Sequence, residues 1–147
     1  MTPTTEALRQ VFRRELRLRQ PPGSSSDANG VGAAAAASYE ELARQVTRII
    51  GGAGVSAIYM RSMYLTQKEF PWLSAAPHAE VVESAVQRLR TNLEGHDSSA
   101  VRLAAEVLVV NFADLLVALI GDQLTTRLFQ EAWPEGFRTE SRQERTE

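Results

Sequence analysis

An apolar run from Ala100 to Ile120 constrains the fold of this chain more than any other feature. The run is long enough to span a bilayer, but it contains four polar residues, Arg102, Glu106, Asn111 and Asp114. Four such side chains make insertion as an isolated helix too costly. Apolar residues on nearly every side of a helix are typical of one that other helices surround. We therefore expect a central buried helix and no membrane span.

The rest of the chain also shows helical rather than strand periodicity. Apolar residues recur at helical spacing in four further segments: 38–50, 55–70, 78–93 and 122–133. No segment alternates convincingly as a strand would. The sequence therefore predicts an all-α fold, a compact bundle of about five helices with a central apolar helix at about 100–120.

Composition divides the chain into four parts. Residues 1–19 read as a basic amphipathic helix, and 20–37, rich in Pro, Gly and Ser, read as a flexible linker. Residues 38–137 form the predicted bundle, and the polar tail 138–147 is predicted to be disordered. Ser38 followed by Glu41 matches a capping box, which places the start of the first bundle helix at Ser38.

Glycines interrupt the helical pattern in "RIIGGAGVSA", residues 48–57. A phosphate-binding loop would need a preceding strand and, in many cases, a lysine, and neither is present. We interpret the glycines as a hinge between two helices, where a left-handed turn needs glycine.

A similar pattern appears in residues 48–65 and 118–133: aliphatic residues, a glycine, a helix with an arginine, and an aromatic residue beside proline. Arg61 and Arg127 occupy comparable places in the two segments. Two interpretations stay open, a duplicated unit or a chance likeness between short apolar helices.

Composition excludes several chemistries. The 147 residues contain no cysteine, which rules out disulfides, thiolate metal sites and cysteine nucleophiles. The formal net charge of −2 makes nucleic acid an unlikely partner for the chain as a whole. His78 and His96 lack further ligands at metal-binding spacing, and no serine belongs to a nucleophile motif. We expect a cytoplasmic protein without catalytic residues, metal or cofactor.

Polar residues within the apolar segments suggest one internal cluster. Asp114 lies in the most apolar helix, and a buried carboxylate needs a partner. Arg61 and Arg127 are the natural candidates for that partner. The cluster is then either a structural ion pair or a pocket for a small anionic ligand.

Candidate partner-binding residues fall into two groups. The basic helix supplies Arg9, Arg13, Arg14 and Arg17, which could dock on this bundle or on another protein, or could bind acidic lipid or nucleic acid. Trp72 and Trp133, each beside a proline, are candidate aromatic anchors. The sequence thus favours a non-enzymatic interaction or regulatory module that self-associates as a symmetric dimer, with a ligand-sensing bundle as the alternative.

Overall fold

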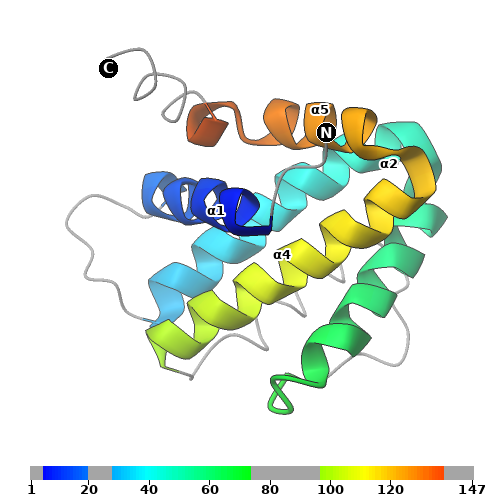
Figure 1. The fold of residues 1–147 in the computed structure, drawn as a ribbon. Coiled ribbons are helices and arrows are strands. Elements are labelled where there is room, and N and C mark those ends of the chain that lie inside the picture. The colour runs from blue at the N-terminus through cyan, green and yellow to red at the C-terminus, as the bar shows by residue number, and fades with distance from the viewer. Residues whose placement is uncertain (1–4, 20–27, 74–96, 138–147) are drawn as a thin grey trace.

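The computed structural model describes residues 5–19, 28–73 and 97–137, and these are helical apart from short turns, with no strand among them (Figure 1). The helices are α1 (Thr5–Arg19), α2 (Ala28–Gln67), α4 (Ser98–Ile120) and α5 (Asp122–Ala132). The predicted all-α bundle is confirmed. The predictions for the segments 20–27, 78–93 and 138–147 lie outside the described residues.

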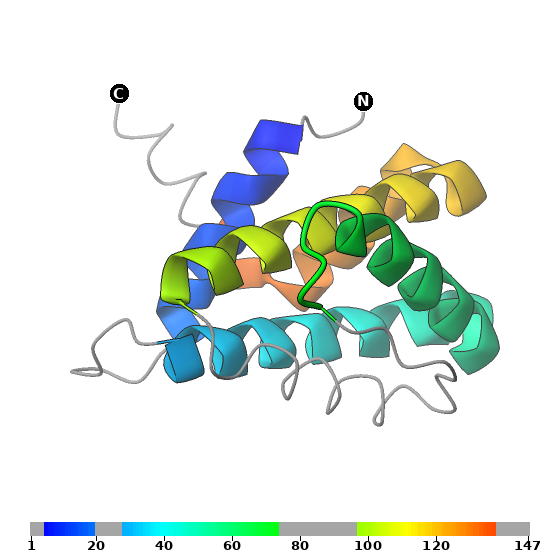
Figure 2. The ribbon, with the colours of Figure 1, turned by 90° about the horizontal axis from the view of Figure 1, so that it is seen from below.

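Two long helical segments form the centre of the fold. The first part of α2, residues 28–50, runs beside α4 and in the same direction (Figures 1 and 2). The second part of α2, residues 52–67, turns back on one side of this pair, and α5 turns back on the other side (Figure 2). Each long segment is therefore followed by a shorter helix, and the two shorter helices cover opposite sides of the central pair.

Each of these turns is a single glycine with positive φ. Gly51 has φ 83 and ψ 164, and Gly121 has φ 90 and ψ 163. This region of backbone conformation is open almost exclusively to glycine. The predicted glycine hinge is confirmed, and a second copy of it lies between α4 and α5.

The two halves of the bundle are equivalent well beyond their glycines. Between 41–67 and 111–137, positions 70 residues apart share the same degree of burial in every pair except 52/122 and 65/135. Ala43 and Ala113 are both buried at equivalent positions. This correspondence supports the duplication interpretation. In this register Arg127 is equivalent to Ala57, so the prediction that it matches Arg61 is wrong.

α4 is central, as predicted. Its buried residues include Val101, Leu108, Phe112 and Leu116, and α2 covers it along its length. Among the described helices, α4 alone is long and apolar enough to cross a membrane by length and composition. Half of its most apolar stretch of 18 residues is buried in the bundle. Asp97 caps its start by accepting a hydrogen bond from the Ser99 amide at 3.0 Å.

The start of α2 corrects the sequence analysis. The helix begins at Ala28, so the described part of the predicted linker, 28–37, is helical. Ser38 is not a cap, because its buried hydroxyl donates to the Ala34 carbonyl at 2.8 Å inside the helix. The alanine run explains the difference, since alanine has the highest helix propensity and extends the helix backwards from Ser38.

We predict opposite effects for alanine at two adjacent glycines. Gly51→Ala places a Cβ in a glycine-only conformation and should lower the free energy of unfolding by about 1–3 kcal/mol. Gly52 has a negative φ, and a Cβ there meets nothing within 4 Å. Gly52→Ala should therefore stabilise by about 0.4–1 kcal/mol. Urea unfolding of both variants measures the difference, and equal effects would contradict the assigned hinge.

Candidate interaction surface

The basic helix α1 packs on the bundle. Its apolar face, Leu8, Val11, Phe12 and Leu16, is buried. The ring of Phe12 lies 5.4 Å from that of Trp133, beyond the end of α5. One of the two docking alternatives left open by the sequence, contact with its own bundle, is therefore the one that the structure shows (Figure 1).

Arg13 anchors α1 to the central helix. Its Nε and Nη2 donate to the two carboxylate oxygens of Glu106 on α4, at 2.7 and 3.0 Å. Glu106 is 2% exposed, whereas the Arg13 side chain is 41% exposed. The hydrogen bond and the charge of Glu106 raise the pKa of Arg13 above its ordinary value. A polar residue of the apolar helix thus pairs with a residue 93 positions away.

The other arginines of α1 are placed differently. The Nε of Arg14 donates to the Gly136 carbonyl at 3.2 Å, and Arg19 pairs with the buried Glu15 at 2.6 Å. Arg17 is exposed, and the Nε of Arg9 is buried without a hydrogen-bond partner among the described residues. Of the four arginines that the sequence analysis assigned to a partner, Arg13 and Arg14 are therefore engaged in contacts with the rest of the fold.

The two tryptophans are not a matching pair of surface anchors. Trp133 is fully buried, and its Nε1 donates to the Ser38 carbonyl at 3.0 Å. Its assignment as a partner-binding residue is wrong. Trp72 is partly buried, with its ring 6.2 Å from that of Phe70.

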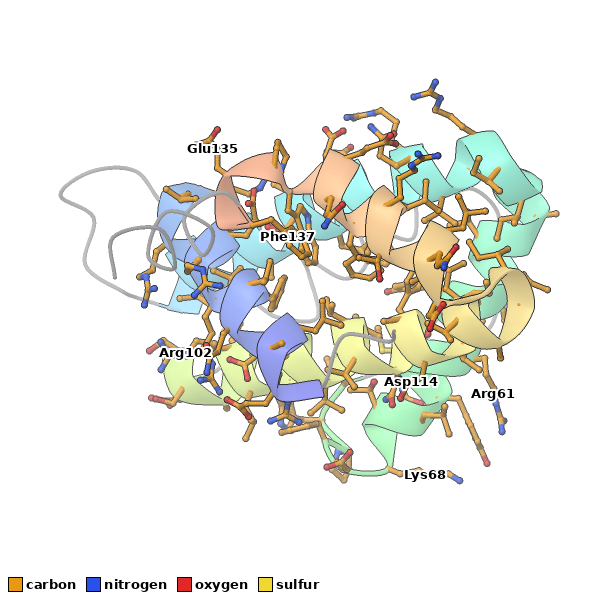
Figure 3. The ribbon with its side chains drawn as sticks, turned by 45° about the horizontal axis from the view of Figure 1, so that its top comes forward. Arg61, Lys68, Arg102, Asp114, Glu135 and Phe137 are labelled. Atoms are coloured by element: carbon orange, nitrogen blue, oxygen red, sulfur yellow. The ribbon has the colours of Figure 1, made fainter. Side chains whose placement is uncertain are left out.

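The predicted polar cluster does not form. Arg61, Asp114 and Arg127 are all exposed, and among the described residues no ion pair joins them. Figure 3 shows Arg61 at the outer edge of the bundle, pointing away from it. The expected burial of Asp114 is wrong because the residue lies on the outer face of α4, away from the bundle core.

An open cleft of about 410 Å³ lies elsewhere, between α1 and the start of α4. It is lined by Arg13, Ser99, Arg102, Leu103 and Glu106. The guanidinium of Arg13 is already paired with Glu106, the carboxylate of this lining. The charge of Arg102, the other cation of the lining, is therefore not balanced within the cleft. The cleft therefore offers limited attraction for an anion.

The second part of α2 presents a more distinctive surface. Five exposed residues follow one another at helical spacing on its outer face; we name them the α2 stripe: Ala57, Met60, Arg61, Tyr64 and Lys68. Met60 is 40% exposed and Tyr64 51%. The stripe combines an apolar centre with two cations.

Tyr64 lies between the two cations of the stripe. The guanidinium carbon of Arg61 is 5.4 Å from the centre of the Tyr64 ring, and the Nζ of Lys68 is 4.9 Å from it. Both distances are within the range of a cation–π interaction, which restrains long side chains that would otherwise move freely. Figure 3 shows both cations extending away from the bundle.

The other half of the fold provides a direct comparison. The positions equivalent to Met60, Arg61 and Tyr64 are Gln130, Glu131 and Pro134, and all of them are exposed. The helical backbone at Gln130 and Glu131 thus carries polar and acidic residues with the same exposure, whereas Pro134 lies beyond the end of α5 and Tyr64 lies within α2. The neighbours of the stripe on α2, Tyr59 and Met63, are buried.

Comparison with known proteins identified no relative of this chain. No protein-family model, no curated protein and no solved structure matches the chain.

We predict that the Arg13–Glu106 pair is asymmetric. Arg13→Ala leaves a buried carboxylate without its partner and should cost about 1–3 kcal/mol. Glu106→Gln should cost less, because solvent can reach the half-exposed Arg13. Adding Glu106→Gln to Arg13→Ala should recover part of the loss. A double-mutant cycle by urea unfolding measures this coupling, and strictly additive effects would argue against it.

Proposed function

We propose that this protein is a non-enzymatic protein–protein interaction module that binds its partner through the α2 stripe. One observation carries the proposal: Met60 is exposed at a helical position where the equivalent half of the fold has Gln130, and Tyr64, one turn further along α2, is exposed beside it. Since the fold accepts a polar residue at the position equivalent to Met60, this exposed pair is better explained by contact with another molecule. A regulatory role is in keeping with such a module.

The residue types of the stripe support this proposal. Tyr, Met and Arg are enriched at the centres of protein interfaces, and Tyr and Arg are frequent among the residues that contribute most to affinity. Met60 is flexible and polarisable, which suits it to packing against a partner of irregular shape. Met60 and Tyr64 lie one helical turn apart, so a single contact can cover both.

The symmetric dimer predicted from the sequence stays a prediction. In a two-fold dimer formed through the stripe, the same face of each copy would meet the other. Arg61 and Lys68 of one copy would then approach those of the second, which opposes association. We expect such a dimer to be weak and to strengthen with salt, because salt screens this repulsion.

We predict that Met60→Gln combined with Tyr64→Ala abolishes partner binding without loss of stability. Exposed substitutions of this kind change the free energy of unfolding by within about 0.5 kcal/mol. The measurement is affinity capture with the whole chain, followed by titration of each purified candidate partner by calorimetry. A true partner should lose at least about tenfold in affinity for the variant.

Gln130→Ala combined with Glu131→Ala is the matched control, since it alters the equivalent face of the other half. This control should bind the partner as the unmodified chain does. Purified partners that bind the stripe variant with unchanged affinity would remove the basis of the proposal. Sedimentation equilibrium of the same proteins tests the dimer.

A further inference from the structure

The geometry points to an acidic amphipathic helix as the partner element that the α2 stripe recognises. This inference rests on the proposed function and adds the chemistry of the occupant. The partner helix would place apolar side chains against Met60 and Tyr64 and carboxylates against Arg61 and Lys68.

The shape of the stripe favours a rod-like partner. Ala57, Arg61, Tyr64 and Lys68 recur every three or four residues, with Met60 beside Arg61, so the stripe follows one face of α2 and ends in the turn after Gln67. Towards the start of this part of α2, the same face continues with a small exposed residue, Ala53. A second helix can approach such a narrow, straight face along its whole length, as in helix-on-helix recognition.

The charge of the stripe determines which charge its partner should carry. Both ionic members, Arg61 and Lys68, are cationic, and each is held beside the Tyr64 ring. Two acidic residues lie nearby: Glu69 in the turn after α2, beyond Lys68, and Asp114 on α4. Among the described residues no ion pair links either acid to the stripe cations. Within the described part of the chain, the positive charge of the stripe is therefore not paired with a carboxylate and can attract an incoming acidic surface.

The equivalent half of the fold strengthens the argument about sign. The position equivalent to Arg61 is Glu131, also exposed. The backbone therefore accepts either charge at this place, so the fold does not by itself require the positive charge of Arg61. Complementary charge at the rim of an interface contributes to partner selection and to the rate of association.

Spacing predicts where the partner's carboxylates lie. Arg61 and Lys68 are seven residues apart, roughly 10 Å along the helix axis. On a helix that runs beside α2, carboxylates about two turns apart would meet both cations, with apolar residues between them for Met60 and Tyr64. A partner carrying acids at this spacing on one apolar face fits the stripe.

The test is selection of binding peptides by the whole chain from a phage library of randomised helical peptides of about 18 residues. We expect enrichment of Asp and Glu about two turns apart beside apolar positions. A synthetic peptide of the selected sequence should lose at least about tenfold in affinity for the variant carrying Arg61→Glu and Lys68→Glu. Its affinity should also fall as salt is raised.

One control protein and one control peptide test whether the recognition is specific. Arg127→Glu reverses a charge on the equivalent face and should leave peptide binding unchanged. A peptide with lysine in place of its acids should bind the Arg61→Glu, Lys68→Glu variant better than it binds the unmodified chain. Failure of this exchange of charges would overturn the inference.

The remaining outcomes separate this inference from the proposed function. Selected peptides that need Met60 and Tyr64 but carry neutral or basic residues would overturn the acidic partner and leave the interaction module standing. Peptides that bind the Met60→Gln, Tyr64→Ala variant equally well would overturn both. Co-sedimentation with phosphatidylserine vesicles that is lost when Arg61 and Lys68 are reversed would assign the stripe to a membrane instead. A dimer that is lost in the Met60→Gln, Tyr64→Ala variant would assign it to a second copy.

Discussion

The fold depends on the side-by-side packing of two long helical segments that run in the same direction, residues 28–50 of α2 and α4. Each segment presents small buried residues: Ala34, Ala35, Ala36 and Ala43 on α2, and Ala104, Ala105 and Ala113 on α4. Small side chains let helix axes approach closely, and the larger residues on either side then fill the layers above and below. Two parallel helices cannot be joined by a short turn, because the end of the first lies far from the start of the second. The chain therefore has to turn back after the first long segment, and it also turns back after the second. Gly51 and Gly121 make those returns possible, since both occupy a backbone conformation that other residues avoid.

The internal repeat separates what the fold requires from what it merely allows. Equivalent buried positions keep their burial while the residue changes: Met63 corresponds to Trp133, and Val55 to Thr125. Such replacements show that the core accepts different shapes if the total packing is maintained. Exposed positions are under no such constraint, and there the halves differ in chemistry. An exposed apolar residue such as Met60, at a position where the other half has Gln130, is therefore informative about binding in a way that an exposed residue without such a counterpart is not.

Local patterns in the sequence predicted the parts of the fold that depend on neighbouring residues. The apolar run marked α4, and the paired glycines marked the hinge. The errors concern contacts between distant segments. Trp133 was expected at the surface because a proline follows it, but α1 and the Ser38 carbonyl enclose it. Glu106 was recognised only as a polar residue of the apolar run, and its partner Arg13 reaches it from α1. Helical periodicity indicates which face is apolar, but it does not show which helix covers that face.

The placement of α1 changes where a partner's charge should be sought. The sequence suggested that its arginines reach another molecule across a linker, yet Arg13 and Arg14 hold α1 against the bundle through Glu106 and the Gly136 carbonyl, and Arg19 pairs with Glu15 within α1. A cation already bound to a carboxylate has little attraction left for a second one, because a new pair must first break the old. Arg61 and Lys68 lie beside the Tyr64 ring, which restrains them without neutralising their charge, and no carboxylate of the described residues pairs with them. Each of these two cations therefore keeps an attraction for an acidic surface that Arg13, bound to Glu106, has largely lost.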